Sequence, residues 1–272
     1  MTGRTRGYSL AELRAGIKPF RLHYFTTLRS TSDHAAKLRQ EGRLFAPAAV
    51  VTSRQTAGRG RGNNTWWSGG SVMTVTFALP IHETLPPQEL PLIAGLAVRG
   101  AVEQLTGAHD VQLKWPNDVL HRGRKLAGLL CERISRADLV GLGLNVNLRN
   151  AQVPAELRNR VTSLFEIAGK EFDMNAVLCV IAHHLHHQMR RREEQPFSIF
   201  VREFQQHDAL LNRRVTILPA GDSAPISGVG EGIDDAGRLK VRSGSDLHRI
   251  VAGQVIAGDG LPQRKTPSRR GG

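Results

Sequence analysis

The chain has 272 residues, of which 40% are hydrophobic and 22% are charged, an ordinary composition for a globular protein of one or two domains. It has no apolar run of about 18 residues, so we expect no transmembrane helix and no membrane partner. The N-terminus lacks the apolar stretch of a signal peptide, and the two cysteines are too few for a disulfide framework. Together these features predict a cytoplasmic protein.

The formal net charge of +13 raises the question of a nucleic-acid partner. Much of this charge lies at the ends, because residues 1–21 hold five basic residues against one acidic residue, and residues 261–272 hold four basic residues and no acidic one. We interpret residues 1–21 as a flexible N-terminal segment and residues 261–272 as a disordered basic tail. No helix-turn-helix module is evident, so we expect no specific binding to DNA.

The first elements alternate between helix and strand patterns. A helix is predicted over residues 33–41, with Thr31 or Ser32 as its N-cap. An apolar strand over residues 48–55 leads into a glycine-rich loop, and the β-branched run over residues 71–79 predicts the strand that returns from it.

A long apolar helix over residues 88–105 follows. The next elements are predicted as strands at 111–115, 119–121, 126–134 and 139–146, and as helices that start from an N-cap at Asp173 and cover residues 197–206. After His207 the pattern changes to short strands separated by Gly and Pro turns, which is typical of a small β-barrel or sandwich. We therefore expect one domain over residues 22–209 and a second over residues 210–260.

The loop at residues 55–67, Gln-Thr-Ala-Gly-Arg-Gly-Arg-Gly-Asn-Asn-Thr-Trp-Trp, alternates glycines with Arg59 and Arg61. The glycines allow the backbone to approach a ligand closely, and the guanidinium groups suit a carboxylate or a phosphate. Trp66 can stack on a flat or apolar group. The loop is not a Walker motif, because no Gly-Lys-Ser/Thr follows. Considered alone, it also fits a basic loop of an RNA-binding protein.

Two further segments place polar groups beside apolar strands. Lys114-Trp-Pro-Asn-Asp118 presents an amine, an amide and a carboxylate at a turn. Arg124-Lys-Leu-Ala-Gly128 puts Lys125 at the start of an apolar strand, where Gly128 permits close approach. A ligand with a phosphate and an apolar body would use both segments.

Taken together, five segments of the chain resemble those of biotin protein ligases. They are Ser30-Thr31-Ser32, Gln55 with Gly58–Arg61 and Trp66, Lys114–Asp118, Arg124–Gly128, and Gly141-Leu-Gly-Leu-Asn145. They occur in the family's order and at its spacing, over about residues 22–260. Ser32 stands where the family usually has Asn, and Asn63-Asn64 replaces a further Gly-Arg of many bacterial members.

The resemblance implies an α+β fold, in which a class II aminoacyl-tRNA-synthetase-like catalytic domain with a mixed sheet and flanking helices precedes a small SH3-like β-barrel. It implies ATP and biotin as substrates, Mg²⁺ with the ATP, and biotinyl-5′-AMP as the intermediate. The implied acceptor is a lysine on the biotin carboxyl carrier domain of acetyl-CoA carboxylase or a related carboxylase. Both a monomer and a homodimer are compatible with the sequence.

The same resemblance implies roles for individual residues. The implied catalytic residues are Lys125, Arg59, Arg61, Lys114 and Asp118, and Asp118 is also the implied Mg²⁺ ligand. The implied biotin-binding residues are Ser30, Thr31, Ser32, Gln55, Arg59, Gly60, Arg61, Lys125 and Gly128. The implied ATP and adenylate contacts are Gly58, Arg59, Arg61, Trp66, Lys114, Asn117 and Asn145.

Two alternatives stay open at this point. A lipoate ligase or an octanoyl transferase would share the fold, and octanoyl transferases use a cysteine nucleophile, for which Cys131 beside the Lys-Leu-Ala-Gly segment is a candidate. An RNA-binding protein would use the Arg-Gly loop, but that function leaves Lys114–Asp118 and Lys125 unexplained.

Overall fold

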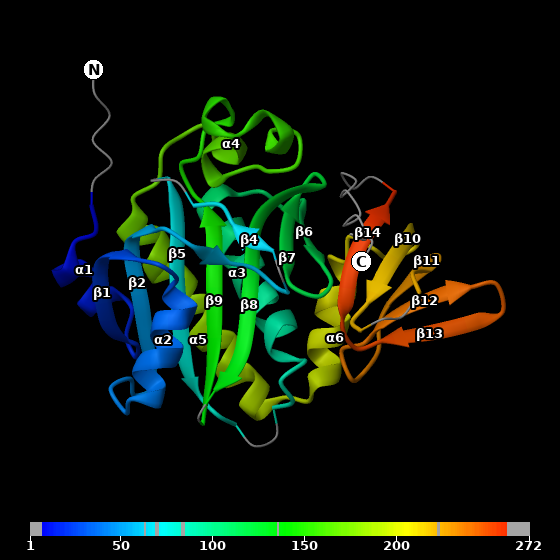
Figure 1. Cartoon of the computed structure of the whole chain (residues 1–272), viewed down its shortest axis with the longest axis horizontal. Coiled ribbons are helices and arrows are strands. Elements are labelled where there is room, and N and C mark those ends of the chain that lie inside the picture. The colour runs from blue at the N-terminus through cyan, green and yellow to red at the C-terminus, as the bar shows by residue number, and fades with distance from the viewer. Residues whose placement is uncertain are drawn as a thin grey trace, which may run out of the picture.

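A seven-stranded mixed sheet forms the larger part of the molecule (Figure 1). The computed structural model describes residues 7–259, apart from residues 63, 69–70, 83–84, 135 and 222–223. In the strand order β1-β2-β5-β9-β8-β7-β6, the first pair is parallel and the other neighbouring pairs are antiparallel. The strands are β1 (Arg21–Leu28), β2 (Ala48–Gln55), β5 (Val72–Pro80), β6 (Val111–Lys114), β7 (Asp118–His121), β8 (Arg124–Ile134) and β9 (Ala137–Asn145).

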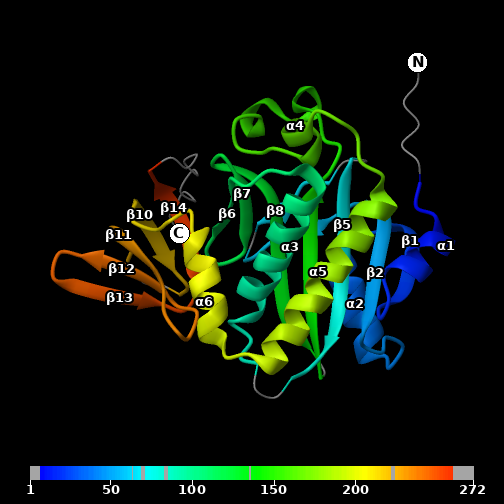
Figure 2. The ribbon, with the colours of Figure 1, turned by 180° about the vertical axis from the view of Figure 1, so that it is seen from behind.

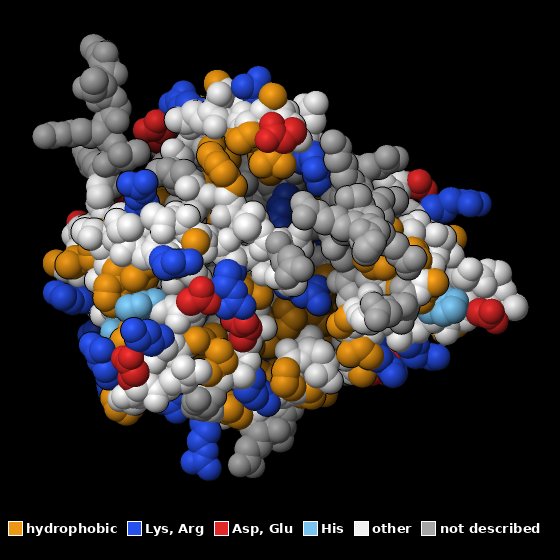
Figure 3. All heavy atoms as spheres, in the orientation of Figure 1, with side chains coloured by type: hydrophobic (Ala, Val, Ile, Leu, Met, Phe, Trp, Pro, Cys, Tyr) orange, Lys and Arg blue, Asp and Glu red, His pale blue; other side chains and the backbone are white. Residues whose placement is uncertain are grey.

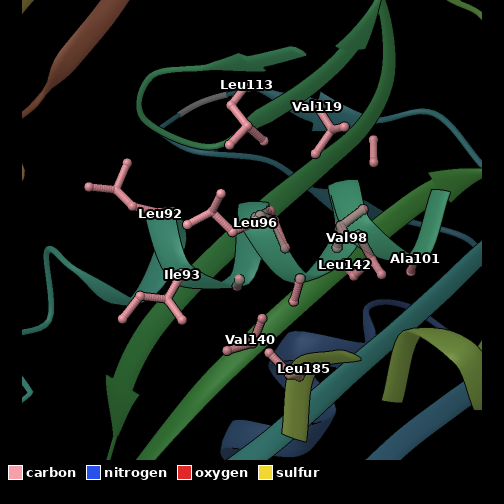
Figure 4. Packing of buried hydrophobic residues seen from close by; sticks show 14 of the residues in the cluster. Leu92, Ile93, Leu96, Val98, Ala101, Leu113, Val119, Val140, Leu142 and Leu185 are labelled. Carbon is pink, nitrogen blue, oxygen red and sulfur yellow. The ribbon is translucent and has the colours of Figure 1, made fainter. Parts of the chain in front are cut away.

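Two long helices, α3 (Leu90–Thr106) and α5 (Met174–Glu194), cover one face of this sheet (Figure 2). α3 is apolar over most of its surface because it lies between the sheet and α5. Its Leu92, Ile93 and Leu96 belong to one buried cluster with strand residues such as Leu113 and Val140 (Figure 4). Each such side chain contributes about 1.5–3 kcal/mol when it leaves water, so this face is the main core of the protein.

The opposite face carries α2 (Thr31–Gln40) and the glycine-rich loop. The shorter helices α1 (Leu10–Gly16), α4 (Leu164–Ala168) and α6 (Phe197–Gln206) instead contact α3 or α5. None of the helices within the described residues is both long and apolar enough to cross a membrane.

Several helix ends test the expectations from sequence. Asp173 is the N-cap of α5, as predicted, and its carboxylate accepts hydrogen bonds from two backbone N–H groups at 2.8 and 3.0 Å. The predicted cap of α2 is wrong, because Ser30 takes that position and accepts from the Asp33 N–H at 3.3 Å. Within the segment expected to be flexible, α1 instead packs on the core through Leu13 and Ile17, both fully buried.

A second, antiparallel sheet of five strands forms the lobe that lies to the right in Figure 1. Its strand order is β13-β12-β11-β10-β14. The strands are β10 (Arg214–Pro219), β11 (Ile226–Ile233), β12 (Leu239–Ser243), β13 (Asp246–Ile250) and β14 (Gly253–Gly258). The apolar run at residues 247–256 is therefore split between β13 and β14, which lie at opposite edges of the sheet.

The two sheets are joined by direct contacts around the end of β6. The indole N–H of Trp115, a residue only 2% exposed, donates to the Gly237 carbonyl at 3.1 Å. Leu113 exchanges backbone hydrogen bonds with the chain that leaves α6, at His207 and Ala209. The position of the second sheet is thus fixed by the same segment that carries Lys114 and Asp118.

Asp208 is buried at this junction, and one of its carboxylate oxygens has no hydrogen-bond partner among the described residues. The other oxygen accepts the Leu210 N–H at 2.8 Å. Burial raises the pKa of Asp208 to about 7, and the Leu210 hydrogen bond only partly opposes this. The folded protein therefore holds the Asp208 proton more tightly than the unfolded chain does.

From this we predict a pH-dependent effect of Asp208→Asn. Between about pH 4 and pH 7, Asp208 is ionised in the unfolded chain but still protonated in the folded protein. Through this group, the free energy of unfolding of the wild type therefore falls by up to about 1.4 kcal/mol per pH unit. Above about pH 7 the fall levels off, because Asp208 is then ionised in both states. The variant should be more stable than the wild type above pH 7 and should lose this advantage towards pH 4. Denaturant unfolding across this range measures the difference. Asp246→Asn, at an exposed position, is the control, and a pH-independent difference for Asp208→Asn would contradict the prediction.

Candidate active site

A cavity of about 1150 Å³ lies where the seven-stranded sheet, the glycine-rich loop and the second sheet meet. Its wall includes the N-terminus of α2, the centres of β8 and β9, the turn at residues 114–118, and parts of β10 and β14. Figure 3 shows a hollow between the larger and the smaller lobe, with Lys or Arg side chains in it. A smaller cavity of about 180 Å³ adjoins it and shares Trp66, Lys114, Asp118 and Lys125 as lining residues.

The glycine-rich loop reaches the cavity as a short hairpin of β3 (Gly58–Arg59) and β4 (Thr65–Trp66). This hairpin places the Trp66 indole over Gly128 and Gly143, which are directly opposite each other on β8 and β9. A Cβ atom at Gly143 would lie 2.2 Å from the Trp66 ring, and one at Gly128 would lie 3.1 Å from it. Only a pair of glycines leaves room for the indole, which lines both cavities.

The two arginines of the loop have different surroundings. Arg59 forms ion pairs with Asp33 on α2 and with Glu132 on β8, the second at 2.8 Å. These hydrogen bonds, with Asp33 first, raise the pKa of Arg59 despite its partial burial. Arg61 is more deeply placed and donates to the Gly253 carbonyl of β14 at 3.1 Å. Burial lowers the pKa of Arg61, and the nearby Asp118 carboxylate opposes that change.

Lys125 and Asp118 form an ion pair where the two cavities meet. The Lys125 Nζ atom lies 2.5 Å from Asp118 Oδ1, and the two side chains are 24% and 10% exposed. The same Nζ atom lies 5.5 Å from the centroid of the Trp66 ring. Lys114 lines both cavities at this place. Lys114 and Lys125 therefore both line the place where the two cavities meet, together with the Asp118 carboxylate.

Neutral polar groups occupy another part of the wall. Ser30, Thr31 and Ser32 begin α2, and the Gln55 amide oxygen accepts the Thr31 backbone N–H at 2.9 Å. All four residues are at most 9% exposed. This neutral cluster suits an uncharged ligand group that carries both hydrogen-bond donors and acceptors.

Asn117 and Asn145 were expected to contact a nucleotide, and both use their amide nitrogen on the backbone. Asn117 Nδ2 donates to the Leu129 carbonyl at 2.5 Å, and Asn145 Nδ2 donates to the Thr162 carbonyl at 2.9 Å. Asn117 lines the large cavity and Asn145 the small one. Each side chain thus holds the wall of a cavity in place.

The sequence-predicted residues meet at these cavities almost without exception. All of them line the large cavity except Gly58 and Asn145, and Asn145 lines the small one. Sequence reasoning gave no site role to several lining residues, namely Thr74, Glu156, Arg160, residues 218–220 and 253–255 of the second sheet, and Gly141 and Gly143 of the fifth motif. The alternating glycines at 141 and 143 were a usable signal, since they face one side of a strand.

Cys131, the possible nucleophile of an octanoyl transferase, is not among the residues that line either cavity. Burial raises the pKa of its thiol, with Asp138 and Glu132 adding to the effect. A thiol that resists ionisation is a poor nucleophile, so the structure disfavours this alternative.

Comparison with known proteins agrees with this geometry. The model of the Biotin/lipoate A/B protein ligase family matches residues 24–148, and that of the Biotin protein ligase C terminal domain matches residues 210–258. The biotin--[acetyl-CoA-carboxylase] ligase of Mycobacterium tuberculosis is 31% identical over 76% of this chain and 77% of its own length. The chain belongs to the biotin protein ligase family.

Solved structures of biotin protein ligases have the same fold. The ligase of Aquifex aeolicus in complex with biotin and ATP superposes with a TM-score of 0.77 and 30% identity, covering 86% of this chain and 97% of the other. The ligase of Leishmania major in complex with biotinyl-5-AMP has a TM-score of 0.61 and 27% identity, covering 85% and 99%. The activity of this biotin ligase is therefore the activation of biotin and its transfer to protein.

The space that Gly128 and Gly143 leave for the Trp66 indole gives a second prediction. In Gly143→Ala the added methyl group must displace the indole, so both cavities change shape, and we expect the rate of biotin ligation to fall at least about tenfold. Tryptophan fluorescence should shift, while thermal unfolding changes little. The control is Gly95→Ala on α3, where the nearest atom to the new Cβ lies at an ordinary 3.5 Å. Parent-like ligation by Gly143→Ala would show that the position of Trp66 is unimportant.

Proposed function

We propose that this biotin ligase joins biotin to a lysine on the carrier domain of acetyl-CoA carboxylase or a related carboxylase, through biotinyl-5′-AMP. In the first step the biotin carboxylate attacks the α-phosphate of ATP, and pyrophosphate leaves. In the second step the carrier lysine attacks the acyl carbon of the mixed anhydride, and AMP leaves. The observation that carries the proposal is the place where the large and the small cavity meet, which Lys114 and Lys125 line. We call this place the cationic junction.

The first step brings two anions together, so it needs fixed positive charge where negative charge accumulates. Lys125 lies at the junction and bridges the carboxylate and the α-phosphate in our proposal. Arg61 holds the phosphate from the loop side, and Lys114 faces the departing pyrophosphate. Arg59, whose ion pairs reach α2 and β8, holds the loop over the intermediate and keeps water away from it.

The two cavities differ in a way that matches the two substrates. The neutral cluster of Ser30, Thr31, Ser32 and Gln55 suits the ureido ring of biotin, which is an uncharged donor–acceptor group. The small cavity has apolar walls from Leu148, Val153, Leu157 and Val161, and these suit adenine. Trp66 separates the two and contacts both substrates. Gly60, Gly128 and Asn117 line the wall around them, and Gly58 leaves room for the Gln55 amide.

Asp118 has two proposed roles. Its carboxylate lies beside Lys125 where the two cavities meet, and Mg²⁺ that arrives with ATP typically needs only one or two protein carboxylates beside the phosphates. The residues therefore fit an ion delivered with the nucleotide, which would neutralise phosphate charge there. In the second step Asp118 accepts the proton that the carrier lysine's ammonium must lose before its amine attacks.

The finer description of the fold is also a proposal. We interpret the mixed sheet over residues 22–209 as a class II aminoacyl-tRNA-synthetase-like domain, and the sheet over residues 210–260 as an SH3-like barrel. The second domain lines the cavity and receives the Arg61 hydrogen bond, which supports a part for it in catalysis.

The intermediate itself gives the test of the proposed function. Without any carrier, the protein should exchange labelled pyrophosphate into ATP only when biotin is present. With carrier, label from biotin should appear on the carrier and not on a carrier whose acceptor lysine is replaced by arginine. Exchange that responds to lipoate and ignores biotin would reject the assignment.

Lys125→Ala tests the central residue. Because the Lys125 charge is used most where carboxylate and α-phosphate meet, adenylation should slow by roughly a hundredfold to a thousandfold. Biotin affinity should change much less, since the neutral cluster remains. Single-turnover adenylation and calorimetry measure the two effects. Lys37→Ala, whose side chain is 69% exposed on α2, is the control. If Lys125→Ala adenylates biotin as fast as the parent, Lys125 takes no part in this step.

A further inference from the structure

Thr76 lies on β5 behind the neutral cluster and is fully buried, so it does not line the cavity. Its hydroxyl nevertheless forms hydrogen bonds with two residues that line the cavity. Thr76 Oγ1 lies 2.9 Å from Thr31 Oγ1 and 3.1 Å from Ser32 Oγ. Thr31 in turn contacts Gln55, with its hydroxyl 3.3 Å from the Gln55 amide oxygen.

The direction of each hydrogen bond in this chain follows from one fixed donor. The Thr31 backbone N–H can only donate, so the Gln55 atom that it meets at 2.9 Å must be the oxygen. The Thr31 hydroxyl shares that oxygen and must therefore donate to it as well. Its own lone pairs accept from Thr76, and Thr76, having used its single proton, accepts from Ser32.

The result is a directed chain of hydroxyls that runs from Ser32 through Thr76 and Thr31 to Gln55. In this chain the Ser32 and Thr31 hydroxyls donate their protons within the protein. Their lone pairs therefore remain available as acceptors on the cavity side. The Gln55 amide, whose oxygen faces the Thr31 N–H, leaves its nitrogen, a donor, as the group available for a ligand. The wall thus offers donors and acceptors in a set pattern before any ligand binds.

This pattern complements a ureido group, which has one carbonyl oxygen and two N–H groups. We propose that Thr76 is a positioning residue for biotin, because its hydroxyl holds Thr31 from behind as a donor to Gln55 and makes Ser32 donate its proton inwards. The proposal rests on the proposed placement of biotin at the neutral cluster. Gly141, which is paired with Thr76 across β5 and β9, leaves room for Ser32, since a Cβ there would lie 2.5 Å from Ser32 Oγ.

The test compares Thr76→Val, which keeps the shape and removes the hydroxyl, with Thr76→Ser, which keeps the hydroxyl. Thr76→Val should raise the KM and Kd for biotin about tenfold, or about 1.4 kcal/mol, through the hydrogen bonds left unmade. The KM for ATP and the kcat at saturating biotin should stay within about twofold, because the cationic junction is untouched. Thr76→Ser should restore biotin affinity to within about threefold of the parent.

A buried threonine elsewhere controls for a purely structural effect. Thr52 on β2 is 2% exposed, and among the described residues its hydroxyl forms hydrogen bonds within its own strand, to the Arg54 backbone. Thr52→Val should leave the biotin KM unchanged. If Thr76→Val is too unstable to study, Thr76→Ala removes the same hydroxyl and carries the same expectation, with thermal unfolding measured beside it.

Gln55→Ala separates the two ways in which the idea can fail. If Gln55→Ala weakens biotin binding and Thr76→Val does not, biotin lies at the neutral cluster but the Thr76 relay is wrong. If neither variant weakens binding, the proposed biotin site itself is wrong, and the relay fails with it. A loss in Thr76→Val that Thr76→Ser does not restore would also overturn the relay.

Discussion

A lysine inside a partly enclosed cavity needs a fixed counter-charge, and Asp118 supplies it for Lys125. The pair is held by the hairpin of β7 and β8, in which Asp118 lies opposite Gly128 and Leu120 lies opposite Lys125. A register shift between Val119 and Leu120 interrupts the regular pairing. Because two residues of β7 then match three of β8, Lys125 lies on the same face of the sheet as Asp118. The ion pair therefore depends on strand register and not on proximity in sequence alone.

Glycines on β8 and β9 leave space on the sheet for the side chains that surround this ion pair. Gly128 and Gly143 clear a space in which the Trp66 indole lies flat, and Gly141 clears a space for Ser32. The order along β9 therefore places the neutral cluster beside the indole, and the indole beside the lysine. In the proposed function, two substrates of unlike chemistry are held on one surface because each meets a different part of it.

The second sheet completes the cavity from outside the catalytic sheet. Its strands β10 and β14 line the wall, and the Gly253 carbonyl accepts from Arg61. Trp115 and Leu113 anchor this sheet through the same turn that carries Lys114 and Asp118. A shift of the second sheet would therefore move cationic groups of the site as well, which couples the two parts of the molecule mechanically.

By itself, the sequence determined the family, most strands and helices, and a set of site residues nearly all of which line the cavities. It could do so because periodicity reports burial along one segment, and because five short motifs retained their order and spacing. It did not reveal that Ser30 caps α2, that α1 is packed on the core, or that Arg59 and Arg61 face different partners. Nor did it show that Thr76 stands behind Thr31 and Ser32, or that β14 reaches the site. Those facts were decided by the tertiary structure, since they depend on contacts between residues far apart in the chain, and no local pattern encodes such contacts.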